Sequence, residues 1–369
     1  MSKISISNVR AAHARGTFLR RKGICFRCSS VLILFGLVSV SSSGQRPASG
    51  RLLNQNGILY SESTGKIYVV DEAKDLVRVI DVAGSVKSIT VPAGPEALAI
   101  NHQTGEVCVA SSLARSVTLI DGQRDEILAT VKLLKPPYSL AIDDATGDIY
   151  LPDNVVIDGR THAVKTVALG SADALLTDAA RQKVFLMGYE SSTISVFDMK
   201  TDAIKQLPTG DFHLWGMAQA GRTLYVGHLQ SASIAAINVD TDSYVLIPTG
   251  RMPCAIAVNV ELGLLFTANY GDGSITVIDT RSNRVVGTIE VGGRLQAIAT
   301  DGERGAIYVA DTLNRKVIAI DAKTRRSKGA TNLPESPYAL AVNQKTHEVY
   351  AATTGPNGFV QVSIPKDAF

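Results

Sequence analysis

The sequence contains little of what would assign it to a known chemical class. It has only four cysteines in 369 residues, and two of them, Cys25 and Cys28, lie close to the N-terminus. Without a second pair, or a histidine directly after Cys28, they match neither a zinc site nor a haem-attachment motif. Cys108 and Cys254 lie in separate apolar segments, so we expect buried free thiols rather than a disulfide.

Catalytic and nucleic-acid-binding motifs are also missing. The chain has no GxSxG nucleophile elbow, no HExxH zinc motif and no glycine-rich loop of the phosphate-binding kind. It has no long basic run interleaved with aromatic residues, which would be typical of a nucleic-acid interface. The sequence therefore predicts no nucleic-acid partner and identifies no reaction.

Acidic residues are absent from the first 46 positions, which carry eight basic side chains; the first acid is Glu62. The remaining 29 basic and 34 acidic residues give the rest of the chain a formal charge of −5, although the whole chain has +3. A basic stretch ending at Lys22 is followed by the apolar run Val31–Val40 and by small residues from Ser41 to Gly44. This order is that of a secretory signal peptide.

The apolar run is too short for a membrane span, because a bilayer-crossing helix needs roughly 20 residues. We therefore predict export to the periplasm or the extracellular space, cleavage between residues 40 and 47, and no stable membrane span afterwards. An uncleaved membrane anchor is the alternative. Residues 1–46 are interpreted as signal peptide and linker, and residues 47–369 as a single domain.

Self-similarity with steps of 35 to 42 residues runs through that domain. A pair of residues recurs eight times, in which an aliphatic residue is followed by an apolar or aromatic one. We call the second residue of each pair the apolar anchor; the anchors are Tyr68, Cys108, Tyr150, Phe185, Tyr225, Phe266, Tyr308 and Tyr350. A polar anchor follows 13 residues later in seven modules and 8 residues later in the third: Asp81, Asp121, Asp158, Asp198, Asn238, Asp279, Asp321 and Ser363. Such a regular period is the signature of a repeat architecture.

Each module predicts four short strands separated by turn residues. In the second module they cover residues 97–100, 107–110, 117–120 and 127–131. The inner strands are apolar throughout, which indicates burial on both faces. We predict an all-β fold, a β-propeller of four-stranded antiparallel blades, with eight blades and seven as the alternative. The polar anchors are expected to cap turns by accepting backbone hydrogen bonds.

The modules resemble a known repeat. Strings such as IYVVDEAKDLVRVID from Ile67 and IYVADTLNRKVIAIDAK from Ile307 are similar to YVTN-type propeller repeats. The resemblance covers residues 57–365 and implies the fold of YncE-like secreted propellers, most of which have seven blades. The shared residues build strands and turns, so the resemblance implies a fold rather than a function.

Candidate site residues lie where the modules differ. In propellers, the loop leading into the innermost strand and the loop between the second and third strands open on one face. The residue before each innermost strand is Glu96, Tyr138, Asp173, Trp215, Cys254, Gln296 or Tyr338, with Asn56 nearest in the first module. This variation has two interpretations: contacts with a ligand, or loop positions that tolerate any residue.

The segment Asp211–Gly216 departs further from the other modules and contains His213 and Trp215, while His228 falls in the next loop of the same predicted face. The candidate ligand-binding residues are therefore Glu96, Tyr138, Asp173, His213, Trp215, Gln296 and Tyr338. Two histidines could ligate a metal, but no compact HxH or HxxxH spacing occurs, so we predict no metal site and no cofactor.

We predict a monomeric, non-enzymatic scaffold that binds a protein or a small molecule on its channel face, which is the face that carries these candidate residues. A cationic or neutral partner suits the charge of −5. Lactonase-like propellers hold a divalent cation in the channel, and Glu96, Asp173 and Gln296 would imitate that arrangement. A channel-metal-dependent hydrolase is therefore the alternative. The third module also lacks five residues between Tyr150 and Asp158, which predicts a lowered rim beside the candidate site.

Overall fold

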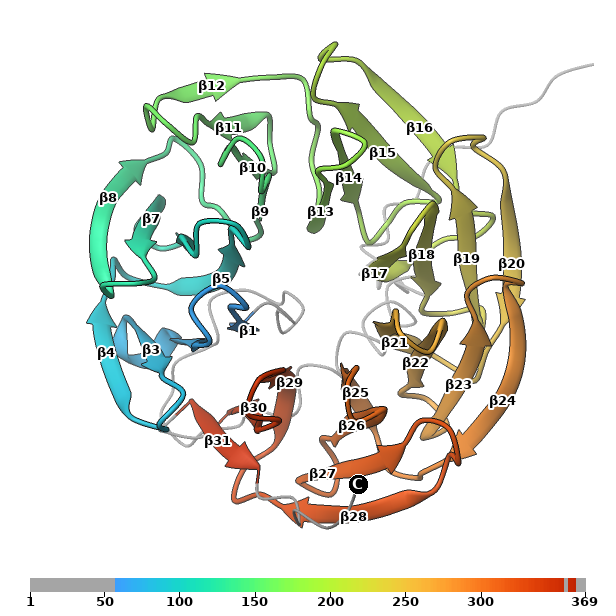
Figure 1. Ribbon diagram of the computed structural model, residues 1–369. Helices are drawn as coiled ribbons and strands as arrows, with labels where there is room; N and C mark the ends of the chain where they lie inside the picture. Colours follow the sequence, from blue (N-terminus) through green and yellow to red (C-terminus); the bar gives the residue numbers. More distant parts are fainter. Residues whose placement is uncertain (1–56, 355–357, 363–369) are drawn as a thin grey trace, which may run out of the picture. The chain divides into compact units, whose positions relative to one another are not determined.

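Short strands rich in Val, Ile, Ala and Tyr dominate the structure, because β-branched and aromatic side chains fit a pleated, buried surface. The computed structural model describes residues 57–354 and 358–362, all within the unit Asn54–Phe369. Eight antiparallel sheets are arranged around a ring (Figure 1). The prediction of an all-β propeller with eight blades is confirmed. The predicted signal peptide and Asn56 lie outside the described residues.

Each blade runs from its innermost to its outermost strand along the chain. Blade 1 contains β1 (Ile58–Tyr60), β2 (Ile67–Asp71), β3 (Leu76–Ile80) and β4 (Val86–Thr90), with the 3-10 helix η2 (Glu72–Lys74) after β2. Blade 2 contains β5 (Pro95–Ile100), β6 (Val107–Ser111), β7 (Ser116–Asp121) and β8 (Glu126–Lys132). Blade 3 contains β9 (Ala141–Ile142), β10 (Ile149–Leu151), β11 (Val155–Ile157) and β12 (Val164–Thr166). Blade 4 contains β13 (Ala174–Asp178), β14 (Lys183–Met187), β15 (Thr193–Asp198) and β16 (Ile204–Pro208).

The second half of the ring repeats this order. Blade 5 contains β17 (Leu214–Ala220), β18 (Thr223–His228), β19 (Ser233–Asn238) and β20 (Tyr244–Pro248). Blade 6 contains β21 (Pro253–Asn259), β22 (Leu264–Asn269), β23 (Ser274–Asp279) and β24 (Arg284–Glu290). Blade 7 contains β25 (Leu295–Asp301), β26 (Ala306–Asp311), β27 (Lys316–Asp321) and β28 (Ser327–Asn332). Blade 8 contains β29 (Pro337–Val342), β30 (Val349–Thr353) and β31 (Phe359–Val362).

Blade 8 has three strands among the described residues. We predict that a segment before the first blade, Arg51-Leu52-Leu53, supplies its outer strand, but that segment lies outside the described residues. Within residues 57–354 and 358–362, no helix has the length and apolar character to cross a bilayer.

The second strand of each blade holds the core together. Every residue of β2 and β6 is buried, as expected for strands covered on both faces. The eight apolar anchors at this level are at most 5% exposed. Fully burying such a side chain stabilises the fold by about 1.5 to 3 kcal/mol. The hydroxyl of Tyr68 also donates to the carbonyl oxygen of Gly122 in blade 2 at 3.1 Å, so an anchor can link two blades.

The polar anchors cap turns, as predicted. Asp279 Oδ1 accepts hydrogen bonds from the backbone N–H groups of Arg281 at 3.2 Å and Ser282 at 2.7 Å. The same two-bond pattern recurs at Asp121, Asp158, Asp198, Asn238 and Asp321. Asp81 Oδ1 accepts instead from the backbone N–H groups of Ala83 and Ser85. Ser363 lies outside the described residues.

Candidate functional site

The ring has two faces, which we name by the loops that form them. The loop face is formed by the segments that lead into the innermost strands and by the loops between the second and third strands. These two kinds of segment are hydrogen-bonded to each other; in blade 2, for example, Ser112 N donates to the carbonyl oxygen of Gly94 at 2.8 Å. On the corner face, each innermost strand turns back into the second strand, for example through residues 101–105. All the residues predicted as a ligand site belong to the loop face.

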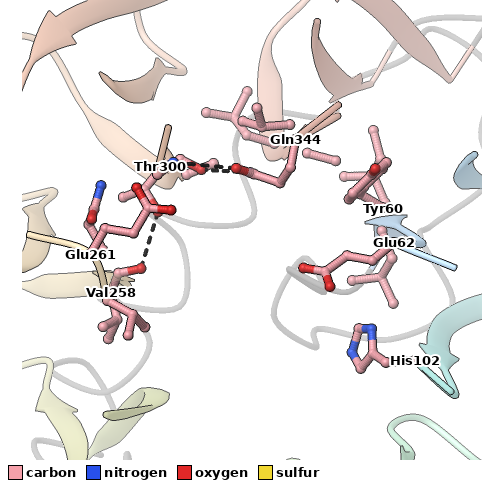
Figure 2. A pocket seen from close by; sticks show the side chains of 16 residues that line it. Tyr60, Glu62, His102, Val258, Glu261, Thr300 and Gln344 are labelled. Carbon is pink, nitrogen blue, oxygen red and sulfur yellow. Dashed lines mark hydrogen bonds between the residues drawn. The ribbon is translucent and has the colours of Figure 1, made fainter. Parts of the chain in front are cut away.

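A cavity of about 430 Å³ lies on the corner face. The ends of the innermost strands of blades 1, 6, 7 and 8 line it, together with His102 from blade 2 (Figure 2). Its walls include apolar side chains such as Ile58, Val258 and Leu340. None of the seven predicted site residues is among the lining residues. No local sequence signal identified this cavity, because residues from five separate modules build it.

Hydrogen bonds between neighbouring blades hold the wall of this cavity. Thr300 Oγ1 donates to the carbonyl oxygen of Val258 at 3.1 Å, which joins blade 7 to blade 6. Gln344 Nε2 donates to the carbonyl oxygen of Thr300 at 3.0 Å, and Gln344 Oε1 accepts from Gly302 N at 3.3 Å, which joins blade 8 to blade 7. These side chains satisfy backbone groups on the inner edge of the sheets, so they fix the shape of the wall.

Exposed ionisable side chains surround the opening. Glu62, His102 and Glu261 line the cavity and are exposed, and Figure 2 shows Glu62 and Glu261 on different sides of the space. Tyr60 lies beside Glu62, and burial together with the negative charge of Glu62 raises the pKa of its phenol. The opening therefore combines a neutral phenol with two carboxylates above an apolar wall, which suits a ligand with an apolar body and a polar or cationic group.

On the loop face, five innermost strands share one irregularity. A β-bulge interrupts the register at the same place in β5, β21, β25 and β29, and one residue pair further along in β17. The residue inside the bulge is Glu96, Gly216, Cys254, Gln296 or Tyr338, because these residues have no partner in the register. Bulges re-aim side chains, which explains why these positions stand apart from the repeat. In blade 5 the bulged residue is Gly216, and Trp215 precedes the bulge and pairs with Gly227.

Most bulged side chains have partners within the protein. Glu96 accepts a hydrogen bond from Ser112 Oγ, and Gln296 Oε1 accepts one from Thr312 Oγ1 at 3.1 Å. Cys254 Sγ donates to the carbonyl oxygen of Leu295 at 3.1 Å. Burial raises the pKa of the Cys254 thiol to about 12, so the sulfur stays protonated at neutral pH. Cys108 and Cys254 are buried free thiols, as predicted.

The structure brings three predicted residues together around a residue that the sequence did not single out. Tyr189 packs edge-on against His213 at 5.3 Å and against Trp215 at 5.9 Å between ring centroids. Its backbone N–H donates to Asp173 Oδ2 at 2.7 Å. Trp215 is only 8% exposed. Tyr189 lies in the loop between the second and third strands of blade 4. Because that loop belongs to the predicted site face, its place in the module could have identified Tyr189 as a site residue.

A second group joins blades 8, 1 and 2 on the same face. Although Glu72 is exposed, partial desolvation of its carboxylate raises its pKa, and the charges of Glu96 and Asp75 raise it further. Burial also raises the pKa of Tyr338 to about 12, with contributions from the charges of Glu72 and Asp71. The predicted residues Glu96 and Tyr338 therefore share the neighbour Glu72. Tyr138 is half-buried in the segment leading into β9.

His228, which we considered as a metal ligand, is fully buried. Its Nδ1 lies 3.1 Å from Ser233 Oγ. Burial lowers the pKa of its imidazole, and the nearby Asp211 opposes that shift. Across residues 57–354 and 358–362, no three His, Cys, Asp or Glu side chains are grouped so that they could hold a metal ion.

The shortened loop of the third module is a tight turn. β10 and β11 are joined through Pro152, Asp153 and Asn154, and the last two have φ of +62° and +74°. Asn154 Oδ1 accepts a hydrogen bond from Gly170 N at 2.6 Å, which fastens the turn to the segment leading into blade 4. This loop is one residue shorter than those of blades 1, 2, 5, 6 and 7, and the rest of the deletion shortens the strands, since β10 and β11 have three residues each.

Comparisons with known proteins support this fold. The family described as "Lactonase, 7-bladed beta-propeller" matches residues 184–291, from β14 to β24. No curated protein matches the sequence.

Solved structures match over most of the chain. "Dihydro-heme d1 dehydrogenase NirN in complex with DHE" is 16% identical, with a TM-score of 0.68, over 87% of this chain and 82% of that one. BamB from Moraxella catarrhalis is 15% identical, with a TM-score of 0.64, over 86% and 96%. Hydrazine synthase of Kuenenia stuttgartiensis is 13% identical, with a TM-score of 0.56, over 88% and 100%. The chain is a β-propeller. Identities this low show the fold alone.

Proposed function

We propose that this protein is an exported, non-enzymatic binding scaffold of the YncE-like, YVTN-repeat kind. In this proposal it receives a small molecule, or a narrow segment of a partner, in the corner-face cavity. The observation that carries the proposal is the cavity itself: an open hollow of about 430 Å³ lined by residues of five blades, with apolar walls and exposed ionisable groups at its opening. Small-molecule sites in proteins have volumes of roughly 300 to 1,000 Å³ and this mixed lining.

The charge supports a neutral or cationic ligand. Glu62 and Glu261 both line the opening, and the chain after residue 46 has a formal charge of −5. Carboxylates at a binding site favour partners of opposite charge and disfavour anionic ones. The loop-face residues Tyr138, Asp173, His213 and Trp215 form the second surface on which such a partner could be recognised.

A thermal-shift screen with a panel of soluble organic cations, sugars and amides tests the proposal. A compound present at about 100 times its Kd stabilises the folded state by about 2.7 kcal/mol. Val260 lines the cavity and is 79% exposed, so Val260→Trp should close the opening without disturbing the core and remove the shift. Val82→Trp is the matched control, because Val82 is 55% exposed and is not among the lining residues.

Two outcomes would contradict this assignment. A shift that survives Val260→Trp but disappears in Trp215→Ala would place binding on the loop face. A panel that produces no shift in the wild-type protein would leave the cavity without the ligand class that its lining favours, and the proposal would be abandoned.

The alternative function, a channel-metal-dependent hydrolase, is favoured by one observation, the lactonase family match over residues 184–291. Glu96, Asp173 and Gln296 are the residues that would be expected to hold the cation. They come from blades 2, 4 and 7, and Asp173 and Gln296 each accept a hydrogen bond from within the protein. The side-chain oxygens of these three residues therefore do not fit a compact metal site. Metal analysis of the purified protein tests this alternative: one divalent ion per chain, lost in Glu96→Ala or Asp173→Ala, would favour the enzyme over the scaffold.

A further inference from the structure

The outermost strand of each blade is an edge strand, and proteins usually protect such edges with charged residues. Seven outermost strands are described, and they lie on the outside of the ring (Figure 1). Six of them contain at least one Lys or Arg: β4, β8, β12, β16, β24 and β28. The exception is β20, whose sequence is YVLIP.

The missing charge falls at a position that is lysine in three of the other outer strands and Ala129, Gly287 or Gly329 in the remaining three. Pairing the outer strand with the third strand aligns Lys87 of β4, Lys165 of β12 and Lys205 of β16 with Val245 of β20. Each of these residues follows the first residue of its strand. Val245 is 50% exposed, so no packing requirement explains an apolar residue there.

The neighbours of Val245 extend the apolar edge. Tyr244 is 39% exposed and Leu246 is 48% exposed. Both side chains lie against Gly210, where a Cβ atom would be 2.8 Å from Tyr244 Cε2 and 3.2 Å from Leu246 Cδ2. Because side chains alternate along a strand, Val245 points to the other side. The edge of β20 therefore presents apolar side chains on both sides.

One edge of β20 is paired and the other is open. Its residues pair with β19 from Ile237↔Tyr244 to Ser233↔Pro248. Among the described residues, no strand pairs with its outer edge. The outward N–H and C=O groups are thus available to a further strand.

We propose that β20 is a docking edge that accepts an extended segment of a partner protein as a fifth strand of blade 5. The small size of the edge favours this occupant over a second copy of the chain. Five residues extend about 17 Å, and the outer strands of a ring curve away on both sides (Figure 1). A five-residue edge alone is a short contact for two rings, because a stable interface buries roughly 800 Å² per partner.

The geometry also defines the chemistry of the segment. Main-chain hydrogen bonds along the open edge supply the affinity in strand addition, and side-chain pairs supply the selectivity. A segment opposite Tyr244, Val245 and Leu246 should be uncharged, with aromatic or β-branched residues in the pairing positions. This surface is independent of the corner-face cavity, so the two proposals stand or fall separately.

Selection of random displayed peptides on the full protein tests the docking edge. The selected peptides should be uncharged and extended, and they should slow amide hydrogen exchange in β20. Val245→Lys gives β20 the lysine that β4, β12 and β16 carry and should weaken peptide binding at least about tenfold, which corresponds to 1.4 kcal/mol. Val286→Lys is the matched control, since Val286 is 41% exposed on β24 and that strand already carries Arg284 and Glu290.

Binding that is equal in wild type and Val245→Lys would overturn the proposal, as would a selection that yields no peptide preferring the wild type. If instead the wild type dimerises and Val245→Lys is monomeric, the occupant is a second copy, and the assignment to an extended partner is wrong. Leu246→Lys, on the other side of the strand, repeats the test if Val245→Lys fails to fold.

Discussion

Raising the pH above 10 should unfold this propeller through its tyrosine anchors. Tyr68, Tyr225, Tyr308 and Tyr350 are at most 2% exposed. Burial is the largest cause that raises the pKa of each phenol from its ordinary value near 10 to about 12. The neutral phenol is thus favoured in the folded state. Their contribution to stability is complete below pH 10 and is lost as the pH rises through 12.

The size of the effect follows from this difference in pKa. At pH 11 a phenol with pKa 10 in the unfolded chain is mostly ionised, while a phenol with pKa 12 in the fold is mostly neutral. Each anchor then loses at most about 1.4 kcal/mol of folding free energy. Four anchors lose roughly 3 to 5 kcal/mol together, a large part of the total stability of about 5 to 15 kcal/mol typical of proteins.

Substitution of one anchor isolates its contribution. Phe185 and Phe266 occupy the same position in blades 4 and 6, so Tyr68→Phe fits the fold. At pH 8 this variant should lose about 1 kcal/mol, because the hydrogen bond from Tyr68 to Gly122 is removed. At pH 11 the wild type alone bears the cost of keeping that phenol neutral, so the loss should shrink to nothing or reverse.

Urea unfolding at pH 8 and pH 11 measures both free energies, and absorbance at 295 nm follows tyrosine ionisation. Phe266→Leu is the control, because it changes the same anchor in blade 6 without removing an ionisable group; its effect should be equal at both pH values. If all 11 tyrosines ionise near pH 10 while the protein stays folded, burial does not hold these phenols neutral and the reasoning fails.

Three further predictions concern the chain ends and the loop face. Exported protein should begin between residues 40 and 47, and an intact mass that includes Met1 would contradict signal cleavage. Deleting residues 47–55 should lower the melting temperature by several degrees, because blade 8 would lose the strand that we predict to cover its edge; unchanged stability would mean that the ring closes otherwise. A ligand bound on the loop face should quench the fluorescence of Trp215, the sole tryptophan, and lose affinity in Trp215→Ala. A ligand of the corner-face cavity should do neither.

The strands could be predicted because each module repeats the same local requirements. An apolar anchor must be buried between two sheets, and a polar anchor must cap the next turn. Both requirements act within about 15 residues, so they leave a signal at a fixed spacing. The second strand of blade 2 was expected at residues 107–110 and is Val107–Ser111. The eight blades follow from the number of such pairs.

The bulge at Gly216 could not be predicted in the same way. Gly216 has φ of +72°, and a Cβ atom there would lie 3.2 Å from the carbonyl oxygen of Cys254 in blade 6. Only glycine meets both conditions easily, so the bulge of β17 lies one residue pair further along than in four other blades and contains a glycine. A contact between two blades decides this choice, and no spacing within a single module records it.

The same kind of contact explains why the loop-face positions vary. Glu96 bonds to Ser112, Gln296 bonds to Thr312, and the thiol of Cys254 donates to the backbone of Leu295. Each of these side chains matches its own neighbour, so their chemical variety does not require a ligand. The cavity on the corner face lacks such an explanation. Thr300 and Gln344 fix its wall, while Glu62 and Glu261 remain exposed at its opening. The corner face is therefore the stronger place to search for a ligand, although the sequence pointed to the opposite one.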